Sequence, residues 1–193
     1  MQPSGPSGSL KGMKLGTAAL ALLTATVGAT LVAAPAYADQ ARYPDPADAS
    51  ASLTDMRAVA VAHGPNRLVV KVRFTDLRAR STGGPSGLAI GIDTDAALKG
   101  PEFRLTSGLQ SGTDYQLVAV SNGDVVGEPL TCPHKVALDF AGDRLTFAAA
   151  RSCLGSPDSV RVALLMRDEF DSSHPVTDWL GAPRSYTDWI VSD

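Results

Sequence analysis

The sequence predicts an all-β fold, an antiparallel β-sandwich of jelly-roll type that holds one disulfide and follows an N-terminal signal helix. Apolar and polar residues alternate along most of the chain after residue 53, which is the pattern of strands buried on one face. Turn residues separate these stretches at short intervals, and no long helical stripe with caps interrupts them. The two cysteines of the chain supply the cross-link.

The first 38 residues have the organisation of a secretory signal peptide. Lys11 and Lys14 precede an uncharged, largely apolar run over residues 15–34, and the small-x-small sequence Ala36-Tyr37-Ala38 follows. We therefore expect export by the Sec route, cleavage after Ala38 and an extracellular protein. An uncleaved membrane anchor is the alternative, because the apolar run of 20 residues could span a bilayer.

Cleavage at this site would leave 155 residues, a length that suits one domain. Met13 is an alternative translation start, since residues 2–12 are Pro-, Ser- and Gly-rich. Residues 39–52 contain prolines and alanines without a periodic apolar pattern, and we expect a flexible N-terminal segment there. The sandwich domain is expected over residues 53–193.

Strand predictions follow from the alternation. In residues 67–75, Leu68, Val70, Val72 and Phe74 fall on one face and the polar residues on the other. A continuous apolar run at 160–166 predicts a central strand covered on both faces. The other predicted strands are 57–62, 88–93, 102–105, 115–120, 125–126, 136–140 and 145–149. Residues 63–66 and Asn122-Gly123 predict hairpin turns.

Charge and cysteine content limit the classes of partner. Without Lys11 and Lys14 the chain keeps 15 cations against 20 carboxylates, a net charge near −5 with no basic cluster in the sequence. Nucleic acid and anionic membranes are therefore not expected as partners, and neither is stable membrane insertion after cleavage. Cys132 and Cys153 should form a disulfide outside the cell; a metal-binding or nucleophilic thiol pair is the alternative.

No catalytic residue is predicted. Gly83-Gly-Pro-Ser-Gly87 lacks the spacing of a nucleophile elbow, and His63, His134 and His174 each lie beside a proline or a turn. The chain is therefore expected not to be an enzyme. A small hydrolase whose residues meet only in space is the alternative.

Two groups of residues are candidates for binding. Asp93, Asp95 and Glu102 surround the end of a predicted strand and could bind Ca²⁺, the one cofactor considered, although such aspartates also simply end strands. Trp179 and Tyr186 could stack on sugar rings. For Trp179, packing against the core is an equal alternative, and for Trp189 it is the preferred one.

The chain resembles a group of small secreted actinobacterial proteins with a sandwich similar to DOMON domains and family 9 carbohydrate-binding modules. The stretches that carry this resemblance are Ile92-Asp-Thr-Asp95, Gly100-Pro-Glu-Phe-Arg-Leu105, Arg151-Ser-Cys-Leu-Gly155, Val160-Arg-Val162, Asp178-Trp179 and Asp188-Trp189. The resemblance implies a β-sandwich that binds rather than reacts, with sugars as the commonest ligands, and it transfers neither a haem site nor fixed ligand residues.

The sequence thus predicts a secreted, non-catalytic binding module with a polysaccharide or an envelope protein as its partner. The alternatives are a structural, interaction or inhibitor domain of the cell envelope and the small hydrolase.

Overall fold

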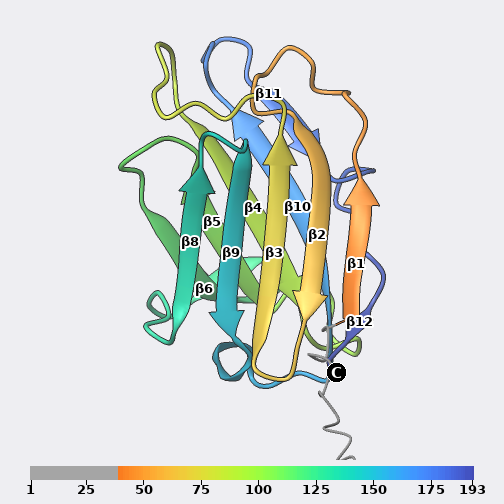
Figure 1. The fold of residues 1–193 in the computed structure, drawn as a ribbon. Helices are drawn as coiled ribbons and strands as arrows, with labels where there is room; N and C mark the ends of the chain where they lie inside the picture. Colours follow the sequence, from red (N-terminus) through yellow and green to blue (C-terminus); the bar gives the residue numbers. More distant parts are fainter. Residues whose placement is uncertain (1–38) are drawn as a thin grey trace, which may run out of the picture. The chain divides into compact units, whose positions relative to one another are not determined.

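The computed structural model describes residues 39–193; the expected signal peptide and the alternative start at Met13 lie outside the described residues. The described chain forms two antiparallel sheets that pack as a sandwich (Figure 1). The strand order of the five-stranded sheet is β1 (Asp39–Pro44), β2 (Met56–His63), β3 (Arg67–Phe74), β9 (Arg144–Ala150) and β8 (His134–Asp139). The seven-stranded sheet has the order β11-β10-β4-β5-β6-β7, and β12 also pairs with β10. The bounds of these strands are β11 Val176–Trp179, β10 Ser159–Asp168, β4 Ser86–Asp93, β5 Phe103–Gly108, β6 Tyr115–Ser121, β7 Asp124–Val126 and β12 Ile190–Val191. The predicted fold class is confirmed.

The core lies between the sheets because each strand turns its alternate apolar residues inward. In β3 the buried positions are Leu68, Val70, Val72 and Phe74, as the alternation predicts. Inward residues of both sheets belong to one apolar cluster. The register between neighbouring strands therefore fixes which side chains stand on the two outer faces.

The chain passes between the sheets at three connections: β3 to β4, β7 to β8, and β9 to β10. The third contains the helix η1, Arg151–Leu154, which is four residues long. The disulfide Cys132–Cys153 joins the β7–β8 connection to η1, so the predicted pairing is confirmed and the thiol-pair alternative is excluded. No helix within residues 39–193 combines the length and the apolarity that a membrane crossing requires.

The predicted hairpin at Asn122-Gly123 is also present, between β6 and β7. Both residues have positive φ, 54° and 91°. This is the left-handed backbone of the tight turns that join two antiparallel strands, and Asn and Gly are the residues that adopt it most easily.

The structure corrects two expectations, for residues 39–52 and for β10, and it adds two strands. Residues 39–52 are not simply a flexible segment, because residues 39–44 form β1, and all six of them pair with β2. Strands β11 and β12 were not predicted from the sequence; they have four and two residues, too few to show a period. Strand β10 is not covered on both faces, since its outward Ala163 and Leu165 are only half-buried.

Candidate functional site

The outer face of the seven-stranded sheet brings together side chains from five strands. Trp179 of β11 lies opposite Leu165 of β10, and Leu165 lies opposite Ala89 of β4. Ala89 is paired with Thr106 of β5, which is paired with Gln116 of β6. Residues directly opposite in neighbouring strands project to the same face. These five residues therefore form one row across the sheet, from an indole ring to an amide.

A groove of about 520 Å³ is lined by four of these five residues, Leu165, Ala89, Thr106 and Gln116, and Trp179 stands outside its lining, opposite Leu165. Its floor is low because β4 places Gly87 and Ala89 outward, where larger side chains would fill the space. Tyr115 and Gln116 of β6 line one part of the groove, and Arg167 and Glu169 line another. The surface is thus a shallow apolar trough with hydrogen-bonding groups at its rim, which is the usual composition of a small-ligand site.

Trp179, predicted as a ligand-binding residue, is half-buried beside this groove. Its strand partner Leu165 lines the groove, so the indole stands on the same outer face and not in the core between the sheets. Of the two interpretations that the sequence left open, the register favours the surface position.

Tyr186, the other predicted ligand residue, does not line the groove and packs against an arginine instead. Its ring and the ring of Trp189 both contact the guanidinium of Arg161, whose carbon lies 4.8 Å and 4.7 Å from the two ring centroids. Burial, followed by the charge of Asp93, raises the pKa of Tyr186. The half-buried Trp189 covers Arg161 on the outer face, whereas its neighbour Ile190 is in the core.

The predicted metal ligands Asp93, Asp95 and Glu102 have other partners. Asp93 is fully buried and accepts two hydrogen bonds from Arg161, at 2.8 Å and 2.7 Å. Glu102 Oε2 accepts the backbone N–H groups of Thr94 and Asp95 at 2.7 Å and 3.2 Å. Within residues 39–193 these three do not form a group of converging ligand atoms. Their contacts support the alternative interpretation, in which acidic residues end a strand and order its turn.

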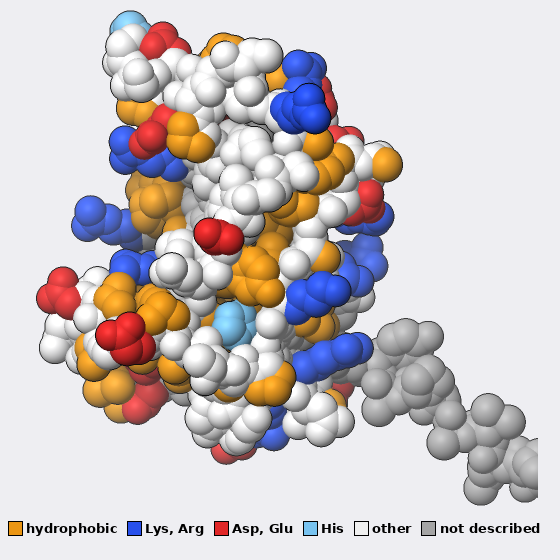
Figure 2. All heavy atoms as spheres, turned by 90° about the vertical axis from the view of Figure 1, so that its left-hand side faces the viewer, with side chains coloured by type: hydrophobic (Ala, Val, Ile, Leu, Met, Phe, Trp, Pro, Cys, Tyr) orange, Lys and Arg blue, Asp and Glu red, His pale blue; other side chains and the backbone are white. Residues whose placement is uncertain are grey.

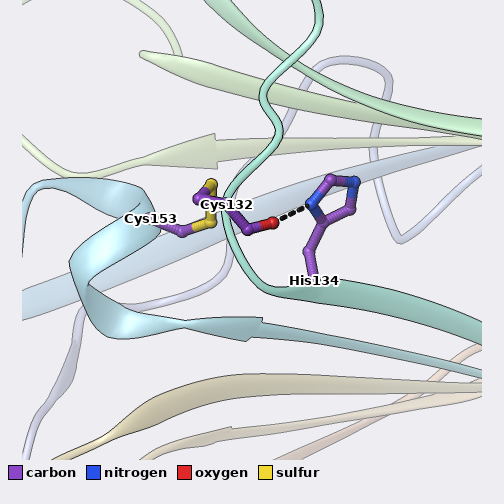
Figure 3. A group of neighbouring side chains, drawn as sticks. All are labelled: Cys132, His134 and Cys153. Atoms are coloured by element: carbon purple, nitrogen blue, oxygen red, sulfur yellow. Dashed lines mark hydrogen bonds between the residues drawn. A yellow bond between two sulfur atoms is a disulfide. The ribbon is translucent and has the colours of Figure 1, made fainter.

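Cys132, His134 and Cys153 do lie close together (Figure 3). Both sulfurs belong to the disulfide, so neither is available as a thiolate ligand. The imidazole of His134 is engaged with the backbone instead, because its Nδ1 is 2.8 Å from the carbonyl oxygen of Cys132. This group is structural.

Ser173, His174 and Asp171 meet on an exposed turn after β10. Ser173 Oγ and Asp171 Oδ2 lie 2.9 Å and 3.1 Å from the same ring nitrogen, Nδ1 of His174. A catalytic triad requires the carboxylate and the nucleophile on opposite nitrogens of the imidazole. The contact therefore gives no support to the hydrolase alternative.

The five-stranded sheet has a cationic outer face, which no run of basic residues in the sequence indicates. Alternation places six exposed cations outward, with Asp139 as the one outward carboxylate in these strands; the cations are Arg42, Arg67, Lys71, Arg73, Lys135 and Arg144. Between them lies a hollow of about 640 Å³ whose lining includes Ala60, Ala62 and Ala148. In Figure 2 this face forms the right-hand flank, from which Lys and Arg side chains project.

The expectation that the protein has no basic cluster is therefore wrong for this face. Its cations come from four strands, β1, β3, β8 and β9. A partial signal was present in the sequence, because Lys71 and Arg73 occupy the non-core positions of a strongly alternating strand. Asp139 is paired with Arg144 at 2.7 Å, which leaves the other five cations without a neighbouring carboxylate on this face.

Comparisons with known protein families, curated proteins and solved structures give no match to this chain.

Proposed function

We propose that the protein is an extracellular, non-catalytic binding module whose ligand is a polysaccharide chain held on the outer face of the seven-stranded sheet. The observation that carries the proposal is the groove and its row of residues from Trp179 to Gln116. The resemblance of the sequence to carbohydrate-binding sandwiches implies the same class of ligand.

The chemistry of the groove suits a sugar. A pyranose ring has an apolar face that packs on an indole and hydroxyl groups that need hydrogen-bond partners. Trp179 and Leu165 offer the apolar contact, while Thr106, Gln116 and the Arg167–Glu169 pair offer donors and acceptors. The low floor formed by β4 leaves the trough open at the surface, as an extended polymer requires.

Substitution of Trp179 tests this proposal. The secreted protein is incubated with a panel of insoluble polysaccharides, and the affinity for the one that retains it is measured with soluble fragments. Trp179→Ala should weaken binding about tenfold, equivalent to about 1.4 kcal/mol. Phe170→Ala is the matched control, because Phe170 is 57% exposed and lines a different hollow. Absence of retention on every polysaccharide, or equal affinity of both variants and the wild type, would contradict the proposal.

The cationic face favours a second candidate, an interaction domain that binds an anionic polymer of the cell envelope. Five cations without a neighbouring carboxylate on one sheet would attract repeated negative charges. The two functions differ in their response to salt. Binding through exposed charges should weaken steeply between about 0.01 M and 0.15 M salt, because screening shortens the reach of those charges. Binding of a neutral chain in the groove should not.

A further inference from the structure

Three aspartates converge at the edge of the sandwich where β1 and β11 lie (Figure 1). Asp45 directly follows β1, Asp48 lies in the same connection, and Asp178 belongs to β11. One carboxylate oxygen of each residue lies within 4.8 Å of those of the other two. The fold thus gathers three negative charges from segments far apart in the sequence.

Two of these carboxylates connect the sheets. Asp45, after a strand of the five-stranded sheet, accepts the backbone N–H of Gly181 at 3.1 Å. Asp178, in the seven-stranded sheet, accepts the backbone N–H of Met56 at 2.6 Å. Each carboxylate therefore uses one oxygen to hold the opposite sheet, and the second oxygen remains.

The second oxygens lack partners. Asp45 Oδ2 and Asp178 Oδ1 are buried and have no hydrogen bond, and the two residues are only 5% and 2% exposed. Buried carboxylate oxygens are normally hydrogen-bonded or bound to a cation, since removing them from water is costly. Here two such oxygens occur within one cluster of acids.

The surrounding charges increase this cost. Burial, together with the charges of Asp45, Asp48 and Asp55, raises the pKa of Asp178 to about 7. Burial also raises the pKa of Asp45. The positive charge of Arg57 lowers the pKa of Asp45, but the guanidinium is itself paired with Asp55 at 3.2 Å. A cation of another kind would relieve the repulsion.

We propose that Asp45, Asp48 and Asp178 bind one Ca²⁺ ion, which fastens the β1 edge of the five-stranded sheet to the β11 edge of the seven-stranded sheet. Carboxylate oxygens are the ligands that hard cations prefer, and Ca²⁺ accepts irregular sets of six to eight oxygens. Asp48 is exposed, so water can reach the ion and complete its shell. The near-complete burial of Asp45 and Asp178 excludes a sugar from the pair and so argues against a glycosidase site.

Thermal unfolding in Ca²⁺ and in EDTA tests the site. Ca²⁺ at about a hundred times its Kd should raise the Tm of the wild type by about 5–10 °C. Mg²⁺ should have a smaller effect, because it demands near-octahedral geometry and gives up water reluctantly. Calorimetric titration of the EDTA-treated, dialysed protein should give one Ca²⁺ per chain. An identical Tm in Ca²⁺ and EDTA, with no heat of binding, would overturn the proposal.

Matched variants locate the ion. Asp48→Asn removes an exposed carboxylate without opening the core and should lower Ca²⁺ affinity at least tenfold. Asp124→Asn removes a carboxylate of β7 that is also exposed and should leave the affinity unchanged. Asp178→Asn keeps an oxygen for the N–H of Met56 and should also abolish the Ca²⁺-dependent rise in Tm. Wild-type affinity in Asp48→Asn, or a loss in Asp124→Asn, would place any bound ion elsewhere. None of these measurements depends on polysaccharide binding.

Discussion

The guanidinium of Arg161 lies between two aromatic rings and against the fully buried carboxylate of Asp93. Arg161 itself is partly exposed, with 30% of its side chain accessible. One end of the outer face of the seven-stranded sheet is built on this contact, because Tyr186 and Trp189 pack on the cation that Asp93 holds. Removing the cation would leave a buried negative charge without compensation.

Arg161→Gln should therefore lower the free energy of unfolding by about 3 kcal/mol, measured by urea denaturation. Asp93→Asn combined with Arg161→Gln should cost less than the sum of the two single changes, because the double variant buries no unpaired charge. Arg167→Gln is the control, since it breaks an exposed pair with Glu169 and should change stability by less than about 1 kcal/mol. Additive single changes would show that Arg161 and Asp93 act independently.

The partners of individual side chains were the part of the structure that the sequence predicted least well. Asp93 and Asp95 have the spacing of metal ligands, but Arg161 reaches Asp93 from a strand that the sequence does not place beside it. Asp45 and Asp178 show the reverse case. No spacing relates them, and they meet because β1 and β11 are edge strands on the same side of the sandwich.

At the scale of the elements, strands of six or more residues within the predicted domain were recognisable because one face of each is buried. Strands β2 and β3 show this in the match between their alternation and their burial. Short edge strands carry too few residues to display a period, which is why β11 and β12 were missed. Strand β1 was missed because its sequence, Asp-Gln-Ala-Arg-Tyr-Pro, has no sustained alternation of apolar and polar residues, although the edge of β2 was available to pair with it.

The disulfide joins two of the three connections between the sheets. Replacement of Cys132 and Cys153 by Ser should lower the free energy of unfolding by about 3 kcal/mol, because it releases a loop of 22 residues in the unfolded chain. Guanidinium denaturation of the variant and of the oxidised wild type gives this difference. Both proteins should share a native circular dichroism spectrum, since the strands on either side pair independently of the sulfurs. A loss of the β-sheet spectrum in dilute buffer would instead show that the fold requires the cross-link.

On the scale of the whole molecule, the two outer faces differ in chemistry. The seven-stranded sheet has a shallow groove with Trp179 at its side. The five-stranded sheet has a cationic outer face, although the overall charge of the chain is negative. Sequence alternation predicted two faces per strand but not which strands would be neighbours. The groove and the cationic face are consequences of strand order, so they became visible only with the topology.

The two faces can be distinguished by mapping ligand contacts with NMR. A ¹⁵N-labelled protein is titrated with soluble fragments of the polysaccharide that retains it, and chemical-shift changes are followed for backbone amides and for the indole N–H of Trp179. We predict shifts at Ala89, Thr106, Gln116 and Trp179, with Lys71 and Arg73 unaffected. Shifts confined to Lys71, Arg73 and their neighbours, or no shifts with any sugar, would contradict a polysaccharide site in the groove.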